Sequence, residues 1–130
     1  MHDPLRLLVL TAPIFDPEPR HYDAVRRVVP DIEIDVHEGR TAPSEAFASP
    51  HIIFGWPSVD RLKEASALRW LHLPSAGADR YANRAHYVRD DVVISASKGV
   101  FAVPIAEHVI AMMLAFSRNL PLYWSQQSQG

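Results

Sequence analysis

Short apolar runs alternate with stretches of helical periodicity along most of the sequence, and this alternation constrains the fold more than any other feature. Five runs bounded by turn residues predict strands at residues 5–10, 32–36, 51–54, 70–73 and 92–95. Segments between them predict helical crossovers at residues 19–29, 43–48, 57–68 and 82–88. Because parallel strands need crossovers of this kind, the pattern predicts an α/β fold with a parallel sheet.

The composition of the strands indicates their order in the sheet. Residues 32–36 read Ile-Glu-Ile-Asp-Val and alternate apolar with acidic side chains, which is typical of a half-exposed edge strand. Residues 7–10 and 52–54 are continuously apolar, which is typical of interior strands. This favours a flavodoxin-like five-stranded sheet of order 2-1-3-4-5 over an order that buries the second strand.

A long apolar helix is predicted after the fifth strand, from Pro104 to about Asn119, and a polar tail without strand character follows it. Ile105, Val109 and Met112 share one stripe of this helix, but other apolar residues lie outside that stripe. A helix that is apolar over most of its circumference needs cover on more than one side. We therefore expect a homodimer formed through residues 104–119.

Charge and composition exclude several classes of protein. Over 130 residues, 48% are hydrophobic and 22% are charged, as in ordinary globular domains. The formal charge of −2 and the scattered basic residues give no footprint for nucleic acid or an anionic membrane. The absence of cysteine fits a reducing compartment. No basic leader precedes the first apolar run, which argues against a signal peptide. The apolar run 109–116 is too short to span a bilayer. We expect a cytoplasmic protein without nucleic-acid or membrane partners.

Ligands of open α/β sheets bind beyond the carboxyl ends of the strands, near the point where strand order reverses. The candidate loops here are residues 11–13, 55–57, 74–77 and 97–99. Small side chains at Ser75, Ala76 and Gly77 let backbone N–H groups approach an anion, although such residues also form ordinary turns. The Trp56 ring either covers the same crevice or packs as a buried aromatic, and Lys98 either pairs with an anionic ligand or is solvated.

Other chemistry lacks its sequence signature. Seven histidines, listed from the N-terminus as His2, His21, His37, His51, His72, His86 and His108, show no metal-ligand spacing, so we predict no metal site. Glu107 and His108 are helix neighbours that point about 100° apart, which favours surface residues over an acid–base pair. No G-x-S-x-G, P-loop or G-x-G-x-x-G pattern occurs in the sequence.

Three blocks of sequence resemble one enzyme family. Residues 68–79 read Leu-Arg-Trp-Leu-His-Leu-Pro-Ser-Ala-Gly-Ala-Asp, residues 99–108 read Gly-Val-Phe-Ala-Val-Pro-Ile-Ala-Glu-His, and residues 118–121 read Arg-Asn-Leu-Pro. In sequence and spacing these blocks are similar to the D-isomer-specific 2-hydroxyacid dehydrogenases. The similarity covers residues 68–121 and is only architectural before them. Many relatives carry Asn where Ala96 stands, and their turn often reads Gly-Ala-Gly or Gly-Thr-Gly.

The resemblance implies a role for several residues. The turn of Ser75, Ala76 and Gly77 would hold the substrate carboxylate through backbone amides, Trp56 would flank the substrate, and Val100 would contact the cofactor. The catalytic Arg, Glu and His of the family follow its dinucleotide fingerprint. No residue of this chain therefore inherits a catalytic role.

The resemblance also implies a division of labour with a second domain. Residues 1–103 would form the substrate-binding domain and residues 104–130 the interdomain or dimerisation helix with its tail, while the NAD-binding Rossmann domain would be absent. We expect the substrate-binding part of an NAD(P)-dependent oxidoreductase that interconverts 2-keto acids and D-2-hydroxy acids. Such a fragment would bind neither NAD nor NADP stably and would be inactive without the missing domain. The particular acid and the choice between NAD and NADP stay open.

Two other readings belong to different classes. A flavodoxin-like binding or signalling module, such as a receiver domain, would need an acidic cluster after the first strand and an aspartate after the third. Thr11-Ala12 and Gly55-Trp56 occupy those places. The chain is alternatively an oligomerisation domain whose contact is the helix of residues 104–119, a reading compatible with the dehydrogenase.

Overall fold

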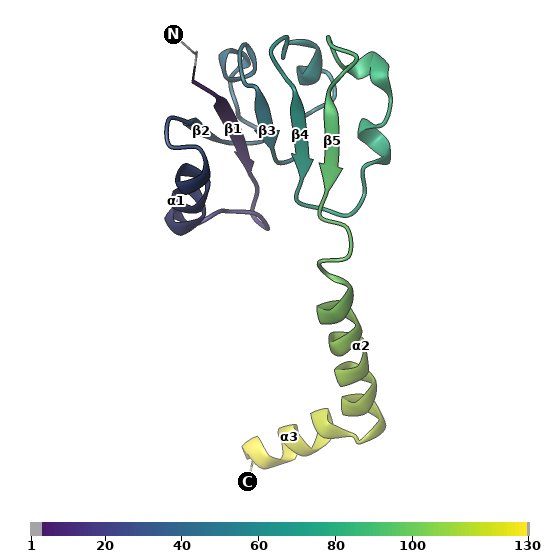
Figure 1. The fold of residues 1–130 in the computed structure, drawn as a ribbon. Coiled ribbons are helices and arrows are strands. Elements are labelled where there is room, and N and C mark those ends of the chain that lie inside the picture. The colour runs from purple at the N-terminus through teal and green to yellow at the C-terminus, as the bar shows by residue number, and fades with distance from the viewer. Residues whose placement is uncertain (1–3, 130) are drawn as a thin grey trace. The chain divides into compact units, whose positions relative to one another are not determined.

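The computed structural model describes residues 4–129 and contains one sheet of five parallel strands (Figure 1). The strands are β1 (Arg6–Thr11), β2 (Glu33–Glu38), β3 (Ile52–Phe54), β4 (Trp70–Leu73) and β5 (Val93–Ala96). Their order is β2-β1-β3-β4-β5. The predicted α/β class and the flavodoxin-like strand order are confirmed.

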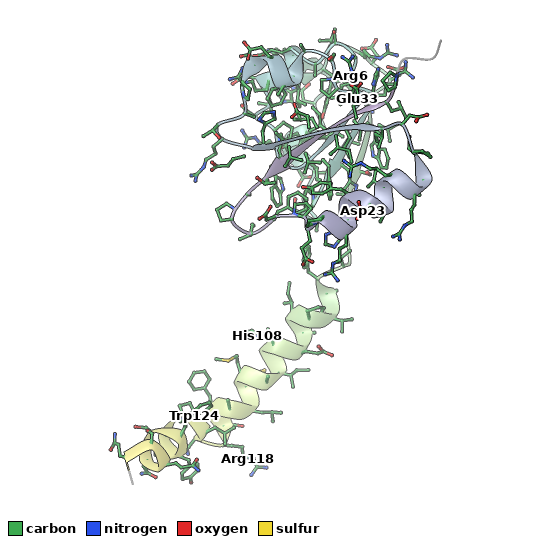
Figure 2. The ribbon with its side chains drawn as sticks, turned by 90° about the vertical axis from the view of Figure 1, so that its left-hand side faces the viewer. Arg6, Asp23, Glu33, His108, Arg118 and Trp124 are labelled. Carbon is green, nitrogen blue, oxygen red and sulfur yellow. The ribbon has the colours of Figure 1, made fainter. Side chains whose placement is uncertain are left out.

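Register places the apolar strand residues in rows across the sheet. Leu8 of β1 pairs with Ile53 of β3, which in turn pairs with Leu71 of β4, and all three are buried. Arg6 and Glu33 are the first residues of β1 and of the edge strand β2. The Arg6 guanidinium and the Glu33 carboxylate form an ion pair of 3.0 Å (Figure 2). The acidic positions of β2 thus lie at the exposed edge, as the alternation predicts.

Of the four predicted crossover helices, the first alone is an α-helix within the described residues: α1 (Pro19–Val28). The other three segments contain short 3₁₀ turns instead, η1 (Ser44–Phe47), η2 (Arg61–Lys63) and η4 (Arg84–His86). A further 3₁₀ turn, η3 (Asp79–Tyr81), precedes the last of them. The prediction of a helix over residues 57–68 is wrong. Its apolar positions recur every three residues, which is also the repeat of consecutive 3₁₀ turns. Leu62, Ala65 and Leu68 are all buried without a continuous α-helix.

Each face of the sheet has its own core. On one face, the row of Leu8, Ile53 and Leu71 packs against residues from the 3₁₀ turns, including Phe47 and Leu62. On the other face, the smaller core includes Leu7, Val9 and Ile32, with residues of α1 packed against it. The short turns and α1 therefore cover opposite faces of the same sheet.

The chain divides into two compact units, Met1–Ser97 and Lys98–Gly130, and the second contains α2 (Ala102–Ser117) and α3 (Leu120–Gln129). The predicted domain boundary between residues 103 and 104 stays a prediction. The long helix ends two residues earlier than expected, because Asn119 adopts a left-handed φ of 54° and its N–H donates to the Phe116 carbonyl. The polar tail is helical as far as Gln129, and Gly130 lies outside the described residues.

Residues 4–129 contain no helix that is both long enough and apolar enough to cross a bilayer.

Candidate functional site

A cavity of about 860 Å³ opens at the carboxyl ends of four strands in the first unit. The loops after β1, β2, β3 and β4 each contribute to its wall, among them residues Ala12, Gly39, Trp56 and Gly77. Strand order reverses between β1 and β3, since β1 lies between β2 and β3. The cavity therefore occupies the place where open α/β sheets receive their ligands.

The loop after β3 is fixed by a glycine. Gly55 has φ +135°, and a Cβ added there would lie 2.5 Å from the carbonyl oxygen of Leu10 and 2.7 Å from its Cβ. Only glycine fits this close approach of two neighbouring strands. The next residue, Trp56, is half-buried, and its ring meets the Phe15 ring edge-on with 5.7 Å between centroids. Trp56 therefore packs against Phe15 and also lines the cavity.

The loop after β4 presents backbone donors that the protein does not use. Within residues 4–129, the N–H groups of Ser75, Ala76 and Gly77 donate to no protein acceptor. The Ser75 side chain accepts a 2.9 Å hydrogen bond from the Trp56 indole, and the Ser75 carbonyl accepts one of 3.1 Å from the Ser97 N–H. The loop is therefore held at both sides while three consecutive amides remain available to a ligand oxygen.

Two buried tyrosines support the same loops from below. The Tyr81 hydroxyl donates to the Pro57 carbonyl at 2.8 Å, and the Tyr87 hydroxyl donates to the Tyr81 carbonyl at 2.8 Å. Burial raises the pKa of Tyr87 to about 12 and also raises the pKa of Tyr81. Both phenols therefore stay protonated and keep donating at neutral pH.

Three arginines in the cavity wall were not singled out from the sequence. Arg40 follows β2, Arg61 lies in η2 and Arg80 lies in η3, and all three line the cavity. They are scattered along the chain, so the sequence shows no basic cluster. Each lies in a connection that follows a different strand, and parallel strands bring the ends of these connections to one edge. The sequence signal for such a site is a basic residue in each of several strand connections, and not a cluster of basic residues along the chain.

A solved structure of a D-isomer specific 2-hydroxyacid dehydrogenase family protein from Aeromonas salmonicida subsp. salmonicida is similar to this chain. The TM-score is 0.68 and the sequence identity is 25% over 96% of this chain. The resemblance to the D-isomer-specific 2-hydroxyacid dehydrogenases is confirmed. This chain spans 39% of the length of that dehydrogenase family protein. No family profile matches the sequence, and no curated protein matches it at a significant level.

The structure places the residues that the dehydrogenase resemblance assigns in two groups. Trp56, Ser75 and Gly77 lie together at one edge of the sheet, with Ala76 between the last two. Val100 belongs to the second unit, together with Lys98, and is 63% exposed. The substrate roles of Trp56 and residues 75–77 and the cofactor role of Val100 stay predictions.

The turn between β1 and α1 does not fit the dinucleotide of a dehydrogenase. Dinucleotides place their pyrophosphate at a helix N-terminus that follows a glycine-rich turn. Here Glu18 caps α1 through its main chain: its carbonyl accepts from the His21 N–H at 2.9 Å, and its N–H donates to the His21 imidazole at 2.9 Å. The Glu18 carboxylate pairs with Arg20 at 2.9 Å. Residues 11–13 read Thr-Ala-Pro and contain no glycine. A carboxylate at a helix N-terminus disfavours a second anion there, so the β1–α1 turn does not fit a dinucleotide pyrophosphate.

Glu107 and His108 lie on α2 and are both exposed, and Figure 2 shows His108 on this helix. Among residues 4–129, no group of three His, Asp or Glu side chains is placed to hold a metal ion. His2 lies outside the described residues.

Replacing Trp56 by phenylalanine tests the contact between the two loops. The change keeps an aromatic ring beside Phe15 but removes the indole donor to Ser75. We expect the free energy of unfolding to fall by about 1 kcal/mol, the net worth of one hydrogen bond. Urea denaturation measures this, and Trp124→Phe, at an exposed position of α3, is the matched control. Equal effects of the two changes would contradict a specific role for the Trp56 indole.

Proposed function

We propose that this chain is the substrate-binding part of an NAD(P)-dependent oxidoreductase that interconverts 2-keto acids and D-2-hydroxy acids. The observation that carries the proposal is the loop after β4. Its consecutive N–H groups at Ser75, Ala76 and Gly77 have no acceptor within residues 4–129. They follow the carboxyl end of β4, the strand next to β3, and Gly77 lines the cavity. A carboxylate that accepts from such amides forms charge-assisted hydrogen bonds, which are stronger than neutral ones.

In this proposal the chain binds and orients the acid. The amides of residues 75–77 receive the substrate carboxylate, and the Trp56 ring beside them excludes water. Hydride transfer is the chemistry of the nicotinamide, which a Rossmann domain outside this sequence would hold. The catalytic Arg, Glu and His expected of the family would come from that domain as well.

Replacing Gly77 by alanine tests the carboxylate site without disturbing the fold. A Cβ at Gly77 would meet no atom within 4 Å, so we expect unfolding to be unaffected. Because Gly77 lines the cavity, the added methyl group would occupy space next to the amides. We expect the affinity for pyruvate or glyoxylate to fall about 10-fold, the loss of roughly one charge-assisted hydrogen bond. Calorimetric titration of the 130-residue chain measures the affinity.

Gly39→Ala is the matched control, because its added Cβ would make only ordinary contacts of 3.5 Å or more at another part of the cavity wall. We expect this variant to bind both acids like the unchanged chain. Amide chemical shifts should move first at residues 75–77 on titration. Saturation of the chain with pyruvate while these three shifts stay fixed would place the acid elsewhere and overturn the proposed site.

The division of labour has its own test. NADH oxidation with glyoxylate, hydroxypyruvate or pyruvate should not exceed the background rate when the 130-residue chain is the sole protein. Turnover by this chain alone would show that it holds the nicotinamide and would contradict the proposal.

The expected dimer through residues 104–119 is checked separately by light scattering at high protein concentration, where a strictly monomeric species would count against it.

A further inference from the structure

The three arginines of the cavity wall give it a charge that a simple keto acid does not need. Arg40 pairs with Glu38 at 3.6 Å, and Arg61 pairs with Glu64 at 3.1 Å. Arg80 forms no ion pair within residues 4–129. Three guanidinium groups thus meet two carboxylates, and a positive charge on the wall is left without a protein partner.

Arg61 is held in place before any ligand arrives. Its guanidinium lies 5.7 Å from the centre of the Phe47 ring and donates to the Ser44 hydroxyl. Its side chain is 35% exposed, whereas that of Arg40 is 84% exposed. A charge that is partly removed from water interacts more strongly with an anion. We therefore expect Arg61 to attract an anionic ligand more strongly than Arg40 does. Arg80 complements Arg61, because its guanidinium forms no ion pair with any of the residues that the structure describes.

Arg80 lies close to the amide loop in sequence as well as in space. It follows Gly77 by three positions, and both residues line the same cavity. The cavity volume of about 860 Å³ is near the upper end of the range for ligand pockets, and a three-carbon acid would fill little of it. A ligand that is anchored at the amides of residues 75–77 therefore has room to extend along the wall toward Arg80 and Arg61.

We propose that the acid bound here carries a second anionic group, a carboxylate or a phosphate, which Arg61 and Arg80 receive. This inference rests on the proposed function, because it assigns the first carboxylate to the amides of residues 75–77. The planar guanidinium presents a fork of donors that matches the oxygens of either group. The cavity thus selects 2-keto or 2-hydroxy acids that carry a second anionic group over acids with a single carboxylate.

Pairs of acids that differ only in the second anionic group test the selection. The 130-residue chain is titrated calorimetrically with 2-oxoglutarate against 2-oxopentanoate, and with 3-phosphoglycerate against glycerate. We expect 2-oxoglutarate or 3-phosphoglycerate to bind about 10-fold more tightly than its singly charged partner, because a hydrogen bond to a charged group contributes about this much affinity. Preference in the first pair identifies a carboxylate as the second group, and preference in the second pair identifies a phosphate.

Arg80→Gln should abolish the preference, because the acid with two anionic groups should then bind no more tightly than its partner with one. The residue is exposed, so this variant is expected to fold even if Arg61→Gln, which also loses contacts to Phe47 and Ser44, does not. Arg27→Gln on α1 is the charge-matched control and should keep the preference. Equal affinity for the two members of each pair, or a preference that survives Arg80→Gln, would overturn this inference while the proposed function stands. Failure of all four acids to bind would instead overturn both.

Discussion

Replacing Gly55 by alanine is expected to lower the free energy of unfolding by about 3 kcal/mol or more, since positive-φ strain and overpacking each cost roughly 1–3 kcal/mol. The glycine has φ +135°, a region that side chains other than glycine rarely adopt. An added Cβ would also lie 2.5 Å from the Leu10 carbonyl oxygen. Gly55 directly follows β3 and Leu10 belongs to β1, and these two strands are neighbours inside the sheet. Neither backbone can therefore move freely to relieve the clash.

Urea denaturation of the variant, followed by circular dichroism, measures this loss. Gly77→Ala is the control, because it makes the same chemical change at a position with open space and no positive φ. Since Gly55 directly precedes Trp56, we also expect the Gly55 variant to bind keto acids less well than the unchanged chain does. Equal stability of the two variants would show that β1 and β3 separate readily, contrary to the packing described above.

Raising the pH from 10 to 12 is expected to destabilise the protein by about 2 kcal/mol through its buried tyrosines. Burial raises the pKa of Tyr87 from 10 to about 12, and the pKa of Tyr81 is raised in the same direction. An unfolded tyrosine loses its proton near pH 10, whereas the folded one keeps it. The stability from these phenols is therefore complete below pH 10 and is lost as the pH rises through the folded pKa.

Tyr87→Phe separates this effect from other alkaline titrations. At neutral pH the variant loses the hydrogen bond to the Tyr81 carbonyl, which costs about 1 kcal/mol. Between pH 10 and 12 its stability should decline less steeply than that of the unchanged chain. Free energies of unfolding from urea titrations at each pH give the comparison. Parallel decline of the two proteins would mean that Tyr87 does not titrate with the raised pKa.

The sheet was predictable from the sequence because its signals are local. Alternation of apolar and acidic residues over 32–36 marks an edge strand, and continuous apolar runs mark interior strands. The connections were less predictable, because the spacing of Leu62, Ala65 and Leu68 suits an α-helix and a series of 3₁₀ turns alike. Only the packing of these residues against one face of the sheet decides between the two.

The candidate site was predictable in part for a topological reason. The carboxyl ends of parallel strands meet at one edge, so the loops at residues 55–57 and 74–77 were expected to lie close together, and the hydrogen bond from Trp56 to Ser75 joins them. The wall arginines were not predicted, because Arg61 and Arg80 lie several residues beyond the strand ends. Their distance from the cavity depends on the path of the connections. The periodicity of apolar residues does not determine that path.

The unused N–H groups at residues 75–77 belong to the main chain, and this affects how the substrate range of such a protein can diverge. Substitution of a side chain does not remove a backbone donor, so affinity for an acid would persist through mutations in the loop that leave the space in front of the amides open, as Gly77 does. Arg61 and Arg80 are side chains, and single codon changes replace them. New specificities for the part of the substrate beyond its carboxylate can therefore arise, or be engineered, while the carboxylate is still bound by the main chain.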